Sequence, residues 1–295
     1  MLEKLKQSLL SIVFYSSSLL GNDCSSISSN YSKIIERYIA DNSNICIVYI
    51  ADTHKPNVRT DEFTEEINRL KPGAMQHNEA VVKDVQKELF RTLEELISKN
   101  NLKVLGIEGL DVDVAYEPLS QLEKLMVFKG GIVKQEELDK FIDEIIQENY
   151  STGVYVEMMY PGLVTFGAED IGIFNKQVAL LLKVQESSTE FRSDLETGKY
   201  KTKYKSKAEI LNRRDEINNM INELHAMNNL RSQAAVNNVL KKMESHNITT
   251  GALVMGGLHT KPILDYLKEL NAKGKKISYV VLEPRSSENY INVDS

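Results

Sequence analysis

Two histidines and a glutamate stand directly after apolar runs of the sequence, where they are suited to binding a metal ion. His54 follows the first of five such runs, Glu108 follows the second and His259 follows the fourth. Neutral imidazoles and carboxylates are typical ligands of zinc, manganese and cobalt, and three protein ligands leave a position open for water. We therefore predict a divalent transition metal (zinc, manganese or cobalt) bound by His54, Glu108 and His259.

The equivalent positions of the two histidines are more informative than either residue alone. A single histidine after a strand is more often a loop residue than a ligand, but the chain has only five histidines, and the other three fall in or beside predicted helices. Gly256 and Gly257 precede His259, and such a pair fits a tight turn in which the backbone approaches a ligand or a helix N-terminus closely.

Other charged side chains accompany the predicted ligands, and two mechanisms are open. With a metal, water activated by the ion attacks an amide or ester bond while a second carboxylate acts as general base. Without a metal, His54 takes the proton from water, Glu108 orients His54, and Arg231 stabilises the developing negative charge. The predicted catalytic residues are His54, Glu108, Arg231 and His259, with Asp52, Glu169 and Asp170 in supporting roles.

The elements that must position these residues are buried strands alternating with helices. The apolar runs are short and rich in Val, Ile or Leu, which is typical of strands covered on both faces. Their alternation with helical patterns predicts an α/β fold with a central, largely parallel sheet flanked by helices, and a site where the carboxyl ends of the strands meet. The predicted strands are 45–50, 102–107, 162–166, 252–255 and 277–282, and the predicted helices are 31–39, 78–98, 135–147, 173–185, 206–224, 230–245 and 261–270.

The chain shows no internal repeat and no long linker, so we predict one α/β domain over residues 42–295. Residues 1–41 are predicted as an N-terminal helical segment, with a signal peptide at residues 1–20 as the alternative. A charged helical excursion is predicted around residues 187–230. Within it, residues 199–207 alternate lysine with tyrosine, threonine or serine, which fits either a solvated loop or lid, or a contact with an acidic partner.

Composition excludes several classes of protein. A net charge of -6 and a pI near 5.6 provide no basic surface for nucleic acid. No run approaches the ~20 apolar residues that a transmembrane helix needs. Cys24 and Cys46 are too few for a disulfide framework, so we expect two free thiols, and a cytoplasmic location is favoured over export.

Several motifs together resemble a known superfamily. It includes the TraB-like and TIKI proteases, the ChaN-like haem-binding lipoproteins and the erythromycin esterases, and the resemblance covers roughly residues 45–284. The first motif has Ala51 where the family usually has glycine, and Leu230 stands where an acidic residue often precedes the arginine. The motifs that carry the resemblance are Ile-Ala-Asp-Thr-His54, Val-Leu-Gly-Ile-Glu108-Gly, Phe-Gly-Ala-Glu169-Asp170, Arg231, and Val-Met-Gly-Gly-Leu-His259-Thr260.

The resemblance implies a compact α/β domain whose site is built from the two histidines, the strand-end glutamate and the arginine. In the TIKI-like members such a site supports metal-dependent peptide cleavage, and in the esterase-like members it supports lactone hydrolysis. We therefore expect a metal-assisted hydrolase of a peptide or a small-molecule ester. The alternatives are a protein that binds haem or a metal without turnover, and a regulatory module that binds a partner through residues 199–207.

Overall fold

A six-stranded sheet forms the centre of the protein. The structure is a computed structural model that describes residues 24–53, 74–111 and 162–290, together with Glu136, Lys140, Val156 and Tyr160. In these residues the strand order is β1-β6-β2-β5-β3-β4, and every neighbouring pair is parallel except β1 with β6. The strands are β1 (Ser32–Tyr38), β2 (Ile45–Asp52), β3 (Val104–Asp111), β4 (Val164–Glu169), β5 (Thr250–Gly256) and β6 (Ile277–Pro284). The predicted α/β class is confirmed.

All five predicted strands are present. β2, β5 and β6 lie in the middle of the sheet and are buried along almost their whole length, which explains their unbroken apolar sequences. β3 and β4 continue further than the apolar runs, so Glu108 and Glu169 belong to the strands and do not follow them. The sheet itself therefore fixes the backbone of both glutamates.

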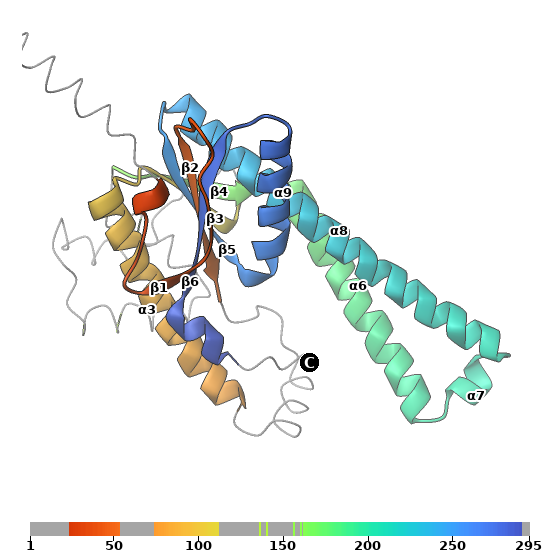
Figure 1. Ribbon diagram of the computed structural model, residues 1–295. Helices are drawn as coiled ribbons and strands as arrows, with labels where there is room; N and C mark the ends of the chain where they lie inside the picture. The colour runs from red at the N-terminus through yellow and green to blue at the C-terminus, as the bar shows by residue number, and fades with distance from the viewer. Residues whose placement is uncertain are drawn as a thin grey trace, which may run out of the picture.

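Helices cover both faces of the sheet (Figure 1). The helix α3 (Ala74–Asn100) packs against one face, where Leu89 and Leu93 contribute to a buried apolar cluster with Val48. The other face is covered by α9 (Thr260–Ala272) and by the C-terminal half of α8 (Lys207–Ser245). The short η1 (Cys24–Ser26), η3 (Gly257–His259) and η4 (Arg285–Asn289) are 3₁₀ turns.

The predicted helix at residues 31–39 is wrong, because this segment forms the edge strand β1. β1 pairs antiparallel with β6, and its register with β6 shifts between Ile34 and Glu36. Isoleucines and tyrosines favour strands, and over so short a segment a helical spacing of apolar residues does not distinguish a helix from a strand. Residues 32–38 are therefore part of the sheet.

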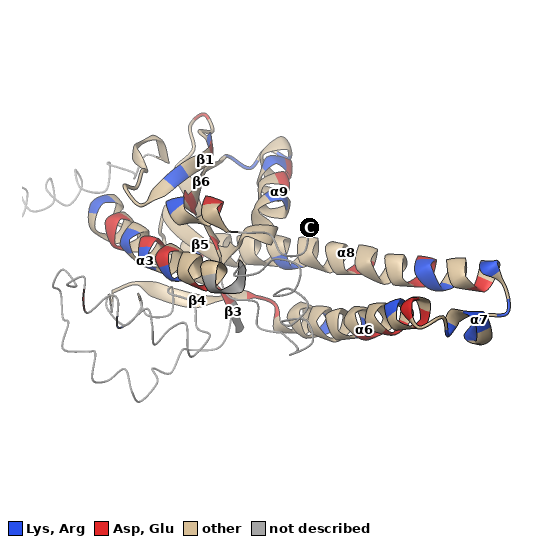
Figure 2. Ribbon diagram, turned by 90° about the horizontal axis from the view of Figure 1, so that it is seen from below, with Lys and Arg blue, Asp and Glu red and all other residues tan. Residues whose placement is uncertain are grey.

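Two long helices extend away from the sheet as an arm (Figures 1 and 2). The arm consists of α6 (Ile171–Glu196), the short α7 (Tyr200–Lys203) and the N-terminal half of α8, with α6 and α8 in contact along its length. The predicted helices 206–224 and 230–245 are one helix, because residues 225–229 contain neither Gly nor Pro. The charged excursion predicted around residues 187–230 is helical over most of its length, and residues 199–207, where a loop or lid was one alternative, include the short helix α7 and the first residue of α8.

Acidic side chains hold the tip of the arm together. The ammonium of Lys203 lies 2.7 Å from Glu190 Oε1 and 2.7 Å from Asp194 Oδ2. The hydrogen bond with Asp194 is the main cause of the raised pKa of Lys203. One of the five lysines at residues 199–207 is therefore used within the chain.

A disulfide joins Cys24 to Cys46, so the expectation of two free thiols is wrong. The two Cα atoms are 5.5 Å apart, and the bond ties η1 to the beginning of β2. Nothing in the sequence indicated this pairing, since the two cysteines are 22 positions apart along the chain and lie together only once β1 has formed between them. Disulfides persist mainly in oxidising compartments, so the bond favours the exported alternative.

Some predictions fall outside the described residues. These are the N-terminal helix or signal peptide at residues 1–20 and all of the predicted helix 135–147 except Glu136 and Lys140, which are helical. Among the helices that the structure describes, none combines the length and the apolar character needed to cross a membrane.

Val85→Asp should unfold the domain. Val85 is fully buried on the face of α3 that packs against the sheet, so the substitution places an unpaired charge in the core. Circular dichroism and urea unfolding measure the effect, and Asp84→Asn, at an exposed neighbouring position of α3, is the control. A folded Val85→Asp protein would show that this helix face is not in the core.

Cys24→Ser should lower the free energy of unfolding by about 3 kcal/mol, because the disulfide restricts the unfolded chain across a 22-residue separation. Urea unfolding with and without dithiothreitol measures this loss. The wild-type protein should weaken on reduction, and the Cys24→Ser variant should not respond. Equal stability of the reduced and oxidised wild-type protein would contradict a stabilising role.

Candidate functional site

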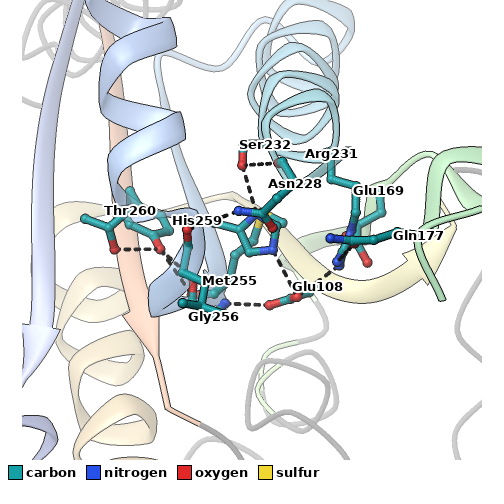
Figure 3. Close-up of polar contacts among 12 residues, drawn as sticks. Glu108, Glu169, Gln177, Asn228, Arg231, Ser232, Met255, Gly256, His259 and Thr260 are labelled. Carbon is teal, nitrogen blue, oxygen red and sulfur yellow. Dashed lines mark hydrogen bonds and ion pairs between the residues drawn. The ribbon is translucent and has the colours of Figure 1, made fainter. Parts of the chain in front are cut away.

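The strand ends bring charged residues together at one edge of the sheet. Asp52 at the end of β2 is in register with Gly256 at the end of β5, and Ile107 of β3 is in register with Val254 of β5. The side chain of Glu108 therefore lies beside the turn that follows β5, and Figure 3 shows it next to His259. Two members of the predicted site, Glu108 and His259, therefore lie side by side at this edge.

Glu108 is held by three groups. Its Oε2 atom accepts a hydrogen bond from the backbone N–H of Gly256, while its Oε1 atom lies 3.0 Å from Arg231 Nη2 and 3.4 Å from His259 Nε2. The side chain of Glu108 is 18% exposed, whereas Asp52 and Glu169 are buried, so Glu108 has more access to solvent than these two carboxylates. A carboxylate with donors on both oxygens has a fixed orientation.

Arg231 uses all of its guanidinium nitrogens inside the protein. Nε and Nη2 contact Glu169, Nη1 donates to Gln177 Oε1, and Nη2 also donates to Glu108. The guanidinium lies over the ring of Phe174, 5.0 Å from its centroid. These contacts favour a role in positioning Glu108 over direct stabilisation of a charge on the substrate.

His259 is fixed from its far side by α8. The hydroxyl of Ser232 donates to the carbonyl oxygen of Asn228 at 2.8 Å and lies 2.8 Å from His259 Nδ1. Serine has a single hydroxyl proton, so when that proton goes to Asn228 the Nδ1–H of His259 donates to Ser232. The Nε2 of a neutral imidazole then turns a lone pair toward the Glu108 carboxylate, which requires a proton or a cation between them.

Tyr49 supports the turn that carries His259. Its hydroxyl donates to the carbonyl oxygen of Gly256 at 3.1 Å and lies 3.1 Å from Thr260 Oγ1. Burial raises the pKa of Tyr49 far above its usual value, and the negative charges of Glu108 and Asp52 raise it further. Tyr49 therefore stays protonated and remains a donor to the turn.

Asp52 is a second buried carboxylate at the same edge. Its Oδ1 atom accepts a hydrogen bond of 2.6 Å from Gln86 Nε2, and Gln86 also donates to the carbonyl oxygen of Thr53. The amide of Gln86 is neutral. Glu169, the other buried carboxylate near this edge, contacts the charged Arg231.

Glu108 and His259 are placed as two ligands of one metal ion would be. Two ligands of one tetrahedral ion, each bonded at ~2.0–2.1 Å, lie roughly 3.4 Å apart. Glu108 Oε1 and His259 Nε2 are separated by 3.4 Å, which is longer than an ordinary N–H···O hydrogen bond. In the described parts of the chain, no group of three or more His, Cys, Asp or Glu residues is arranged so that it could hold a metal ion, and His54, the predicted third ligand, lies outside them.

The structure brings Glu108, Arg231 and His259 together and adds Glu169 through its ion pair with Arg231. Asp170 has a different environment, because it is exposed and caps the N-terminus of α6 by accepting a hydrogen bond from the N–H of Ile173 at 3.0 Å. His259 is 3% exposed, so its side chain is buried where it meets Glu108.

Five polar residues around the site were not predicted, namely Tyr49, Gln86, Gln177, Asn228 and Ser232. Gln177 and Ser232 lie on long helices, where polar residues normally face solvent. The only sequence signal for Ser232 is its position next to Arg231 in the chain.

The chain matches no family model, and no curated protein and no solved structure is significantly similar to it.

Arg231→Met should lower the free energy of unfolding by about 3 kcal/mol, because it removes the guanidinium that contacts the buried carboxylate of Glu169. Adding Glu169→Gln should recover part of the loss by removing the buried negative charge. Urea unfolding measures both variants. Arg214→Met is the control, since Arg214 contacts Asp215 on the exposed surface of the same helix and should change stability by less than about 0.5 kcal/mol. An equal loss in both single variants would contradict a dependence on burial.

Proposed function

We propose that this chain is a hydrolase of peptide or ester bonds, assisted by one divalent transition metal at the carboxyl edge of its sheet. The observation that carries the proposal is the pairing of His259 Nε2 with Glu108 Oε1 at 3.4 Å, with Nδ1 of the same imidazole held by Ser232. A histidine whose second nitrogen is held by a neighbouring polar group is the usual form of a protein metal ligand. Glu108 and His259 would hold the ion, with His54 as the third ligand.

The carboxylates of the site are suited to a cation. Glu108 and Glu169 together bring two negative charges, and Arg231 contacts both of them with one positive charge. When bound, a divalent ion supplies Lewis-acid chemistry, polarising the carbonyl under attack and increasing the acidity of water.

The residues of the chain have separate roles in this proposal. Arg231 and the N–H of Gly256 hold the Glu108 carboxylate in one orientation, and Ser232 holds the ring of His259. Asp52 is assigned as the general base, because it is a carboxylate at the same edge of the sheet that Arg231 is not seen to contact in the described residues. The hydrogen bond from Gln86 orients the Asp52 carboxylate.

His259→Ala and Glu108→Gln should each abolish binding of zinc or manganese and hydrolysis, while Asp52→Asn should lose hydrolysis and keep the metal. Ser232→Ala should weaken metal binding by about 10-fold to 100-fold, because it removes the group that orients His259. Calorimetric titration with zinc and manganese chloride measures binding, and a p-nitrophenyl ester and fluorescent casein are the substrates.

His225→Ala is the matched control for His259→Ala, since His225 is an exposed histidine of α8. It should leave metal binding and hydrolysis unchanged. A wild-type protein that binds neither metal, and whose activity does not respond to a chelator, would exclude the metal-assisted mechanism. The absence of turnover on both substrate classes with a bound metal would favour a metal-binding protein without turnover.

A further inference from the structure

The edge strand β1 and the residues beside it gather large apolar side chains that the domain leaves exposed. The described residues include 13 exposed large hydrophobics, and five of them fall within the short segment 31–39. β6 is the only neighbour of β1 in the described sheet, and Figure 2 shows β1 at the margin of the molecule. The five residues are Tyr31, Ile34, Ile35, Tyr38 and Ile39, which are 38–47% exposed.

The register with β6 assigns each β1 residue to a face of the sheet. Ile34 is in register with Leu282, which belongs to the cluster under α3, and Glu36 is in register with Val281, which belongs to the cluster under α9. Ile35 lies between them and has no partner residue in β6. Side chains of a strand alternate between the two faces, so Ile35, which precedes Glu36, lies on the α3 face together with Ile34.

The same register places the other residues of the strand. Ser32 and Arg37 lie on the α3 face, and Lys33 and Tyr38 lie on the α9 face. Ser32 confirms this assignment, because its hydroxyl lies 2.7 Å from Thr92 Oγ1 of α3. The register shift at Ile35 therefore places two consecutive isoleucines, Ile34 and Ile35, on the same face of the sheet.

We propose that two copies of this chain pair through β1, antiparallel and about a twofold axis perpendicular to the sheet. In one register Ile34 of each copy lies opposite Ile35 of the other, and both lie on the α3 face. Lys33 then lies opposite Glu36 of the second copy on the α9 face, and Tyr31 lies opposite Tyr38. Cross-strand aliphatic, aromatic and opposite-charge pairs all stabilise antiparallel strands.

Charge complementarity selects a second copy as the occupant. Charged residues on an edge strand normally prevent pairing with arbitrary strands. In the twofold register Lys33 and Glu36 are exchanged by the axis and attract each other. Within its own chain Lys33 also contacts Glu283 and Glu288, and Glu36 contacts Lys268. The cross-axis pair therefore adds to ion pairs that are already present. A shift of the register by two residues sets Ile35 opposite either Ser32 or Glu36, so neighbouring registers lose the apolar centre.

Pairing of this kind joins two six-stranded sheets into one continuous sheet. Because the axis is perpendicular to the sheet, the strands of one copy run in the opposite direction to those of the other. The two candidate sites therefore lie at opposite edges of the joined sheet, away from the proposed contact between the copies.

Sedimentation velocity of the full chain over a concentration series tests the proposal. The wild-type protein should sediment as a dimer, and Ile35→Lys should raise the dimer dissociation constant by at least about tenfold, as expected for a central interface residue. Leu182→Lys is the matched control, because Leu182 is an equally large apolar residue that is 51% exposed on α6. It should leave the dimer unchanged.

Charge reversal gives a second test that does not depend on how well Ile35→Lys folds. Lys33→Glu should weaken the dimer by placing a second carboxylate opposite Glu36 of the other copy, and adding Glu36→Lys should restore the attraction. Circular dichroism checks that each variant is folded. A wild-type monomer at the highest soluble concentration, or a double variant no tighter than Lys33→Glu alone, would overturn the proposal.

Discussion

The contact of one guanidinium with two carboxylates joins most of the elements around the candidate site. Arg231 comes from α8, Glu108 from β3 and Glu169 from β4, while Gln177 of α6 completes the set of acceptors. Two glutamates at adjacent strand ends would repel each other in a buried place, so the arrangement requires a positive charge between them. The base of the arm supplies that charge, and the sheet edge and the arm therefore depend on the same interaction.

This dependence gives the arm a structural relation to the chemistry of the site. α6 and α8 both reach the sheet where Arg231 contacts its partners, and the ring of Phe174 covers one side of the guanidinium. A shift of α6 relative to α8 would change the acceptors of Arg231 and so the orientation of Glu108. The part of the arm near the sheet is thus a component of the site, and the distant part is held by its own ion pairs at Lys203.

The sequence was sufficient to predict the five buried strands and the edge where Glu108 and His259 meet, because buried parallel strands have unbroken apolar runs and their carboxyl ends share one edge. It was not sufficient for β1, whose exposed isoleucines carry no pattern that separates a short strand from a short helix. Gln177 and Ser232 also escaped prediction, because polar residues on helices usually face solvent and only the packing of α6, α8 and η3 turns these two inward. The two cysteines could not be paired before the path of residues 24–46 was known.

The disulfide between Cys24 and Cys46 has a mechanical consequence. Tension applied to the chain ahead of residue 24 passes through the sulfur bridge directly to the amino end of β2, and it bypasses the edge strand β1. Cys46 is in register with Thr250 and Ser278 on the two neighbouring strands, so β2 would be pulled along its own axis against hydrogen bonds on both sides. Those bonds share the force in shear, and the opposite end of β2, where Asp52 lies, is the last part of the strand to move.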